Sequence, residues 1–246
     1  ASLAEHAHFK PYTNGTVSGA ENIMSEQGVD RFVVLNIAVS PRTERHVNDF
    51  AISLLTEKNI VPFGSVHPDS ENALKELERL KNAGIKGIKF HNEYQNFYVD
   101  DEKAFPVYEK CTELGFIMVF HGGVDRGNGY PVKTPPERLR KVWKRFPDAK
   151  IVAAHLGGQN MPDGAVDSLA DTSVLVDTGF AALSVPAEQG ERVIRAFGFD
   201  RVLFGSDCPW DTPANTFRYL EGMGFTQEQK DKIYFKNALK LLGEQS

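Results

Sequence analysis

FIMVFHGG, residues 116–123, is the stretch of sequence that decides the fold class, because its apolar run ends in a histidine and two glycines. A short, continuous apolar run of this kind is typical of a strand buried on both faces of a parallel sheet. Six further runs along the chain have the same character and predict strands: RFVVLNI (31–37), VPFGSVH (61–67), GIKFH (87–91), KIVAAH (150–155), VLVDTG (174–179) and RVLFGSD (201–207).

Segments with helical character lie between these runs. Several begin with Asp, Ser or Pro and end at Gly, which are the residues that start and stop helices. Strands that alternate with helices at this spacing predict parallel βαβ units closed into a (β/α)₈ barrel. No linker or change of composition divides the chain, so we expect one barrel domain over residues 1–246.

The predicted strands number one fewer than the eight that such a barrel has. A first strand would have to lie within residues 1–15, where EHAH (5–8) places His6 and His8 at i, i+2. On a strand this pair would face one way and could bind a metal. Too few residues precede it to form a strand, and SLAEHAHF is rich in helix formers. We therefore predict that EHAH is helical and that the first strand is very short or lies upstream of Ala1.

Bulk composition excludes several classes of protein. The chain has 246 residues, 41% hydrophobic and 25% charged, with a net charge of −5. A pI near 5.8 argues against non-specific binding to nucleic acid or to an anionic membrane. No apolar run is long enough for a membrane helix, and the two cysteines form no CxxC pair. We expect a cytoplasmic protein that acts on a small molecule.

Polar residues cluster where the predicted strands end, which is where parallel barrels carry their active sites. His121 and His155 each end an apolar run before Gly-Gly, and Asp207 ends VLFGSD. Two imidazoles and a carboxylate are ligand types of a catalytic zinc site. The structural alternatives are core histidines bonded to backbone carbonyls and, for Asp207, a helix N-cap.

Lys89 and His91 share one strand at i, i+2 and therefore face the same side. They could anchor a substrate carboxylate, Lys89 could be a modified metal bridge, or the pair could form a salt bridge inside the barrel. Trp210, just beyond Asp207, is a third substrate-binding candidate. We expect His67, which precedes a proline, to be structural and His46 to lie on the surface.

The chain resembles the amidohydrolase-related family, which groups metal-dependent hydrolases with aminocarboxymuconate-semialdehyde-type decarboxylases. The resemblance rests on four blocks: GIKFHNEYQNFYVDDEKAFPVYEKCTELGFIMVFHGG (87–123), FPDAKIVAAHLGG (146–158), DRVLFGSDCPW (200–210) and NALKLLG (237–243). It implies a (β/α)₈ barrel with one divalent metal, zinc first and manganese second. It also implies that His121 and Asp207 bind the metal and that His155 acts as acid/base or polarises the attacked group.

The chain departs from that family at the Asp-x-His-x-His motif that ends strand 1, since Ala4 stands where the motif has Asp. Without strand 1 the metal keeps only two of these ligands, His121 and Asp207, with His155 as a third candidate, and its affinity for the protein should fall steeply.

Three functions follow from this pattern. The first is a metal-dependent hydrolase that attacks a small acidic or cyclic substrate with a metal-activated water. The second is a metal-dependent decarboxylase of a small aromatic or unsaturated acid. The third, motivated by the missing strand-1 pair, is a catalytically impaired barrel that serves as a binding protein. A homodimer is compatible with each of them.

Overall fold

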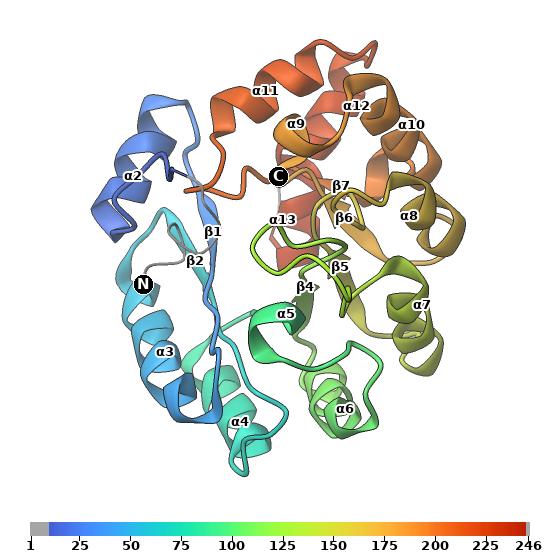
Figure 1. Cartoon of the computed structure of the whole chain (residues 1–246). Helices are drawn as coiled ribbons and strands as arrows, with labels where there is room; N and C mark the ends of the chain where they lie inside the picture. Colours follow the sequence, from blue (N-terminus) through green and yellow to red (C-terminus); the bar gives the residue numbers. More distant parts are fainter. Residues whose placement is uncertain (1–9, 245–246) are drawn as a thin grey trace.

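The fold is a parallel α/β barrel, seen in a computed structural model that describes residues 10–244 (Figure 1). All seven predicted strands are present at the predicted places and are shorter than the apolar runs: β1 (Phe32–Leu35), β2 (Ile60–Phe63), β3 (Gly87–Phe90), β4 (Ile117–Phe120), β5 (Lys150–Ala153), β6 (Leu175–Asp177) and β7 (Val202–Leu203). The EHAH segment lies outside the described residues.

The strands follow one another around the barrel in chain order, each parallel to the next. β1 pairs with β2, and β3 to β7 form a second run of parallel pairs. A bridge joins the two runs: the Gly64 N–H donates to the Gly87 carbonyl at 2.9 Å, and the Lys89 N–H donates to the Gly64 carbonyl at 2.8 Å. Within residues 10–244, β1 and β7 each have one strand neighbour, so the barrel is open between them.

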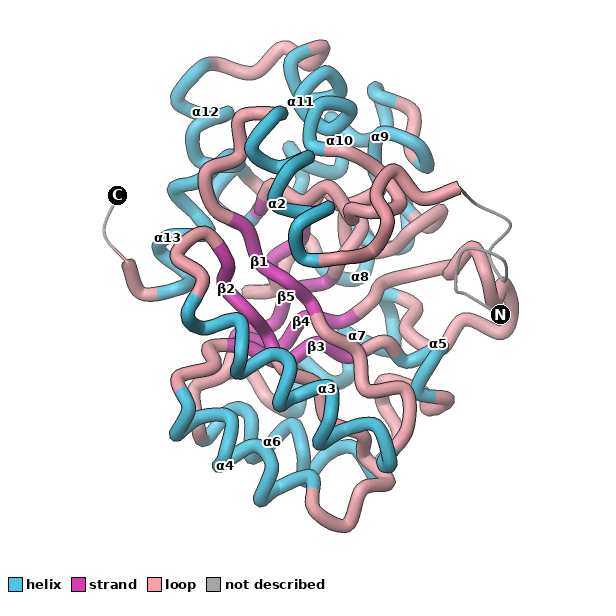
Figure 2. The backbone as a smooth tube through the Cα atoms, turned by 90° about the vertical axis from the view of Figure 1, so that its left-hand side faces the viewer, coloured by secondary structure: helices cyan, strands magenta, loops and turns pink. Residues whose placement is uncertain are grey.

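Helices surround the strands, as Figures 1 and 2 show. The longer ones are α2 (Val17–Glu26), α3 (Pro41–Ser53), α4 (Ala73–Ala83), α6 (Phe105–Glu113), α7 (Pro136–Arg145), α8 (Pro162–Leu169), α10 (Ala187–Phe197) and α11 (Pro213–Glu221). Two single turns, α5 (Asn92–Gln95) and α9 (Ala181–Ser184), follow β3 and β6, and α12 (Gln227–Asp231) and α13 (Asn237–Leu242) flank a π-helical turn at Lys232–Lys236. None of the helices in residues 10–244 has the length and apolar character that crossing a bilayer requires.

Helix α4 illustrates how the sequence specifies these elements. Its buried residues Ala73, Leu77 and Leu80 recur at helical spacing and face the strands. The helix stops at Gly84, whose φ of +99° is a left-handed C-cap that glycine adopts without strain. The predicted alternation of strand and helix is therefore confirmed by the periodicity of the buried side chains.

Two helical features differ from the sequence prediction. The sequence pattern predicts a helix over HVNDFAISLLTEKN (46–59), but helix α3 begins earlier, at Pro41, because Ser40 and Pro41 provide an N-cap and an N1 proline. Helix α11 is absent from the prediction although Thr212 caps it, its hydroxyl accepting from the Asn215 N–H. In both cases the residues that cap the helix were visible in the sequence.

Two hydrophobic clusters hold the barrel together. The larger one packs the helices onto the strands and includes Phe90, Tyr108 and Phe120, whose rings contact one another. The smaller one fills part of the barrel interior, and its members are Val61, Phe63, Ile117, Val119, Val152 and Leu203. The polar side chains at the strand ends are thereby carried on a packed scaffold.

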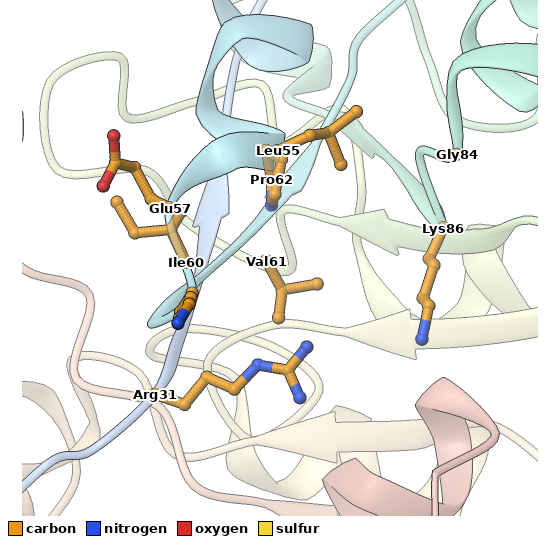
Figure 3. A pocket seen from close by; sticks show the side chains of 9 residues that line it. Arg31, Leu55, Glu57, Ile60, Val61, Pro62, Gly84 and Lys86 are labelled. Atoms are coloured by element: carbon orange, nitrogen blue, oxygen red, sulfur yellow. The ribbon is translucent and has the colours of Figure 1, made fainter.

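A charged clasp lies at the opposite, amino-terminal end of the strands. Glu244 pairs with Arg31 ahead of β1 and with Lys86 ahead of β3, the Lys86 Nζ lying 2.7 Å from its carboxylate. Arg31 and Lys86 line a small cavity of about 260 Å³ at this end (Figure 3). The two cations lower the pKa of Glu244 to about 2.

We predict that Glu244→Gln lowers the melting temperature at pH 6 by about 1–3 °C, the scale expected for partly exposed ion pairs. Because the folded-state pKa is depressed, this stabilisation is complete above the unfolded value near 4.5 and disappears as the pH falls toward 2. Calorimetry between pH 2 and 7 measures it, with the exposed Glu71→Gln as control. If the difference in melting temperature between Glu244→Gln and the wild type is unchanged at pH 2, the ion pairs of Glu244 are not its cause.

Candidate metal and active site

All six predicted site residues line one cavity of about 1040 Å³ and lie toward the carboxyl ends of the strands; they are Lys89, His91, His121, His155, Asp207 and Trp210. They come from β3 and from the segments that directly follow β3, β4, β5 and β7, so the barrel brings together positions far apart in the chain. This is the end at which parallel barrels place their chemistry. The cavity also runs alongside β1 and α13, on the open side of the barrel.

His121 and His155 are in direct contact at the centre of the site. His155 Nε2 lies 3.0 Å from His121 Nδ1, and His155 Nδ1 lies 2.9 Å from the Gly179 carbonyl oxygen. His155 has a φ of +60°, a conformation uncommon outside glycine that turns its ring back over the cavity. Burial lowers the pKa of His121 well below its usual value.

Lys89 and His91 project from β3 into the same cavity, as their spacing predicted. Lys89 is buried, and no carboxylate of the described residues lies within the 4.0 Å of an ion pair. The salt-bridge alternative for Lys89 is therefore wrong within residues 10–244. Burial lowers the pKa of its amine, and the nearby charges of Asp177 and Asp207 partly oppose that shift.

Asp207 lines the cavity and does not cap a helix. Its side chain is accessible to solvent through the cavity even though protein surrounds it closely, and this desolvation raises its pKa. The N-cap alternative is wrong, because the next helix starts at Pro213 with Thr212 as its cap. A φ of +61° at Asp207 directs the side chain inward, in a backbone region that Asp tolerates better than most residues.

His67 and His46 behave as predicted. His67 is buried with both ring nitrogens engaged: Nε2 lies 3.0 Å from the Gln95 carbonyl oxygen, and Nδ1 accepts from the Asp69 N–H at 3.1 Å. The backbone N–H of His67 donates a hydrogen bond to the Glu44 carboxylate. His67 is thus a structural histidine that ties the loop after β2 to helix α5, and His46 is exposed on α3.

The sequence analysis missed two acidic residues that face the histidines. Asp125 and Glu93 are both buried, and each has a carboxylate oxygen near the His91 ring, at 3.7 Å and 3.8 Å. Donor atoms of His91, His121 and Asp125 lie within 4.8 Å of one another. Glu93 stands only two residues beyond His91, but Asp125 lies in a loop whose course over the site the sequence pattern does not reveal.

The site meets a physical test for binding a cation. His121 Nε2 and His91 Nδ1 are buried side-chain nitrogens without a hydrogen-bond partner among the described residues. An unpaired buried polar atom is costly, and a metal ion is one of the groups that satisfies it. Imidazole nitrogen with carboxylate oxygen is a donor set that suits zinc and manganese.

Histidines and carboxylates gather at the carboxyl ends of the strands of this parallel α/β barrel. This arrangement defines the class of protein as a barrel whose site is of an enzyme type and is compatible with a metal. The chain belongs to the amidohydrolase family, whose model matches residues 6–243. The family resemblance noted from the sequence motifs is confirmed.

Three of the relatives are named as decarboxylases. The chain is 23% identical over 238 residues to 2-amino-3-carboxymuconate-6-semialdehyde decarboxylase of Dictyostelium discoideum, covering 81% of this chain and 66% of that protein, just under two thirds of its length. It is similar in structure to 5-carboxyvanillate decarboxylase of Sphingomonas paucimobilis, with a TM-score of 0.77, 18% identity, and coverage of 94% of this chain and 84% of that one.

A third relative is dihydroxybenzoic acid decarboxylase of Polaromonas, solved with bound manganese. The TM-score is 0.73 at 19% identity, with 93% of this chain and 86% of that chain covered. At such low identity the two structural matches show the barrel fold alone. They confirm the predicted (β/α)₈ class.

Proposed function

We propose that this chain is a metal-dependent carboxy-lyase that removes CO₂ from a small aromatic or unsaturated carboxylic acid. The observation that carries the proposal is the buried Lys89 amine, which faces the same cavity as the histidine pair and lacks an ion-pair partner in residues 10–244. Such a group is suited to binding the carboxylate of a substrate. The named relatives, all decarboxylases, favour this second alternative over the hydrolase that the sequence analysis placed first.

The aromatic walls of the cavity favour a flat substrate. Tyr94 and Trp210 line it, and the Tyr94 ring stacks on His91 with centroids 3.9 Å apart. A planar ring inserted here would bury its apolar faces while its carboxylate reaches Lys89. The loops that shape this cavity, 123–135 and 156–161, would then set which acid is accepted.

The roles of the chain's own residues follow from the geometry. Decarboxylation breaks the carbon–carboxyl bond, leaves its electron pair on the carbon, and adds one proton there as CO₂ departs. Asp207, whose carboxyl is accessible to the cavity, would hold that proton and deliver it to the carbon, and His155 would help to position the reacting group. His121, predicted together with Asp207 and His155 as the metal set, would hold a divalent cation, zinc or manganese. When bound, the cation would supply Lewis-acid polarisation of a substrate oxygen.

The proposal is tested by supplying the protein with Mn²⁺ or Zn²⁺ and offering ortho-hydroxybenzoates, a carboxyvanillate and a carboxymuconate semialdehyde. We expect CO₂ release from at least one of them, and in D₂O a product carrying one carbon-bound deuterium. Amides and lactones form the comparison panel. Turnover of that panel without CO₂ would identify a hydrolase instead, and tight binding of acids without turnover would favour a binding protein.

Metal removal gives a separate prediction. Treatment with a chelator and desalting is expected to lower CO₂ release at least about 100-fold, because Lewis-acid stabilisation contributes several kcal/mol to such reactions. Adding back one equivalent of Mn²⁺ or Zn²⁺ should restore it, whereas Mg²⁺, which binds poorly to imidazole, should not. Undiminished activity in the chelated protein, with metal content verified by elemental analysis, would contradict metal dependence.

A further inference from the structure

The side-chain amide of Gln95 joins the segments that follow three strands. Its Oε1 accepts from the His91 N–H at 3.0 Å, and its Nε2 donates to the carbonyls of Ala38 and Val66, each at 3.0 Å. Ala38 lies after β1, Val66 after β2 and His91 after β3. Gln95 is 1% exposed and uses both of its side-chain N–H donors, so this amide cannot exchange its bonds for bonds to water.

The backbone of Gln95 is held as well. The Asp69 N–H can only donate, so His67 Nδ1, 3.1 Å away, is the acceptor. In the neutral ring His67 Nε2 then carries the hydrogen and donates it to the Gln95 carbonyl at 3.0 Å. The Gln95 N–H donates to the His91 carbonyl at 2.9 Å, which closes the turn of α5. The loop after β2 therefore holds this turn through two separate contacts, one to the side chain and one to the backbone of Gln95.

These contacts lie where the two runs of strands meet. β1 and β2 form one run, β3 to β7 form the other, and the bridge at Gly64 joins them. The Lys89 N–H donates to the Gly64 carbonyl, and the Ser65 hydroxyl donates to the Lys89 carbonyl at 2.8 Å. The backbone of Lys89 is thus fixed by Gly64 and Ser65. Two residues further on, the backbone N–H of His91 is fixed by Gln95.

Gln95 acts on the cavity through its neighbours. Among the described residues, His91 and Tyr94 line the cavity, whereas Gln95 and His67 do not. The Tyr94 ring is stacked on the His91 ring at an interplanar angle of 9°, and the His91 ring is stacked on the His121 ring with centroids 4.2 Å apart. A shift of the α5 turn would therefore move two rings of the cavity wall together.

We infer that Gln95 is a positioning residue that sets where the His91 and Tyr94 rings stand and thereby how a planar acid fits the cavity. The inference rests on the proposed function, because it takes this cavity as the substrate site. Gly64 and Ser65 fix Lys89 without Gln95, so the carboxylate anchor stays in place when the amide is removed. Loss of the amide should therefore impair the placement of the ring more than the capture of the carboxylate. A misplacement of about 1 Å can cost about 100-fold in rate.

The experiment compares Gln95→Met with Asn237→Leu in protein supplied with Mn²⁺. Gln95→Met keeps the length of the side chain and removes all three of its hydrogen bonds. Asn237 is the matched control, because it is also a buried amide whose Nδ2 donates to two backbone carbonyls, those of Phe199 at 2.7 Å and Val202 at 2.8 Å. These contacts lie at the amino-terminal end of β7, away from the site. Both variants should have a lower melting temperature, and both are assayed below it.

The first measurement is the kinetics of CO₂ release. For Gln95→Met we expect kcat to fall about 30-fold or more while KM changes less than about threefold, since the ring is misplaced but the anchor is kept. Asn237→Leu should keep both constants within about twofold of the wild type.

The second measurement requires no turnover. Isothermal titration with benzoate and with cyclohexanecarboxylate compares two acids that share a carboxylate and differ in the planarity of the ring. The wild type and Asn237→Leu should bind benzoate more tightly. Gln95→Met should lose at least about threefold of that preference, the scale of one aromatic stacking contact, and should bind cyclohexanecarboxylate with an unchanged Kd.

Two substitutions at His67 test the same turn without changing Gln95, and they keep the inference testable if Gln95→Met does not fold. The amide of His67→Gln can donate to the Gln95 carbonyl as Nε2 does, so this variant should keep kcat within about threefold of the wild type. His67→Leu cannot donate, and its kcat and its preference for benzoate should both fall, as in Gln95→Met. Equal values in the two His67 variants would overturn the positioning of this turn.

The outcomes separate this inference from the proposed function. Unchanged kcat and ring preference in Gln95→Met, equal losses in Gln95→Met and Asn237→Leu, or an equal loss of affinity for both acids would overturn the positioning role even if CO₂ release is observed. A loss of ring preference confined to Gln95→Met, in a protein that releases CO₂ from none of the acids, would sustain the positioning role and refute the reaction. A wild type that binds neither acid would overturn both.

Discussion

Lys89→Met is expected to lose at least about 100-fold in kcat/KM for CO₂ release while becoming more resistant to unfolding. The loss follows from removing the cation that anchors the substrate carboxylate, since one well-placed electrostatic partner contributes about 10²–10³-fold. The gain in stability follows because Lys89 is buried, without a carboxylate within ion-pair distance in residues 10–244. Relieving its desolvation should raise the free energy of unfolding by about 1–2 kcal/mol.

This prediction is specific because the activity of Lys89→Met should fall while its stability should rise. Urea titration of the metal-free protein measures stability, and a continuous CO₂ assay measures activity. Lys75→Met, at an exposed position on α4, is the matched control and should change neither quantity. Lys89→Arg should not restore activity, because the planar guanidinium presents its hydrogen-bond donors in a different geometry from the compact amine. A less stable Lys89→Met protein would show instead that the lysine is a structural cation, and kcat/KM within threefold of wild type would exclude it as an anchor.

The barrel was predictable because its strands have a simple physical signature. A strand buried on both faces must be apolar at consecutive positions. Runs such as FIMVF and KIVAA can therefore be recognised as strands without knowledge of the tertiary structure. Parallel strands also share one direction, which is why Lys89, His121 and His155 could be assigned to one end of the barrel from sequence alone. The open side between β1 and β7 follows the predicted shortage of one strand within residues 10–244.

The finer arrangement of the site was not predictable, because it depends on loops. Asp125 reaches His91 only because its own loop folds back on an Asx-type turn, with the Gly127 and Asn128 amides bonded to its carboxylate. No periodicity marks such a turn as part of a site. The sequence likewise showed that His155 ends a strand but could not show that both of its nitrogens are occupied by Gly179 and His121.

The Gly-Gly pair after His121 allows close approach of one backbone segment to another. A Cβ added at Gly122 would lie 2.8 Å from the Ala154 carbonyl oxygen, and one at Gly123 would lie 2.3 Å from the Gln159 nitrogen. The Gln159 N–H donates to the Gly122 carbonyl, and the Val124 N–H donates to the Gln159 carbonyl. The glycines thus let the loop after β4 lie directly against the loop after β5.

Gly123→Ala is therefore expected to destabilise the protein by about 3 kcal/mol or more, which corresponds to a fall in melting temperature of about 6–12 °C. Two costs combine. The φ of +80° disfavours any residue with a Cβ, and that Cβ would collide with backbone atoms of residues 158 and 159, which cannot rotate away. Because the two loops carry His121 and His155, their separation should also lengthen the 3.0 Å contact between these histidines and weaken metal binding.

Gly129→Ala isolates the steric part of this effect. Gly129 lies in the same loop with a φ of +62°, but a Cβ there would meet nothing within 4 Å. It should therefore show only the conformational cost of a left-handed alanine, about 1 kcal/mol, with metal affinity unchanged. Chemical denaturation and metal titration of the two variants side by side measure the difference. If the two variants lose the same stability, loop contact at Gly123 does not hold the site together. If Gly123→Ala is less stable yet binds metal as the wild type does, the contact stabilises the fold without setting the histidine geometry.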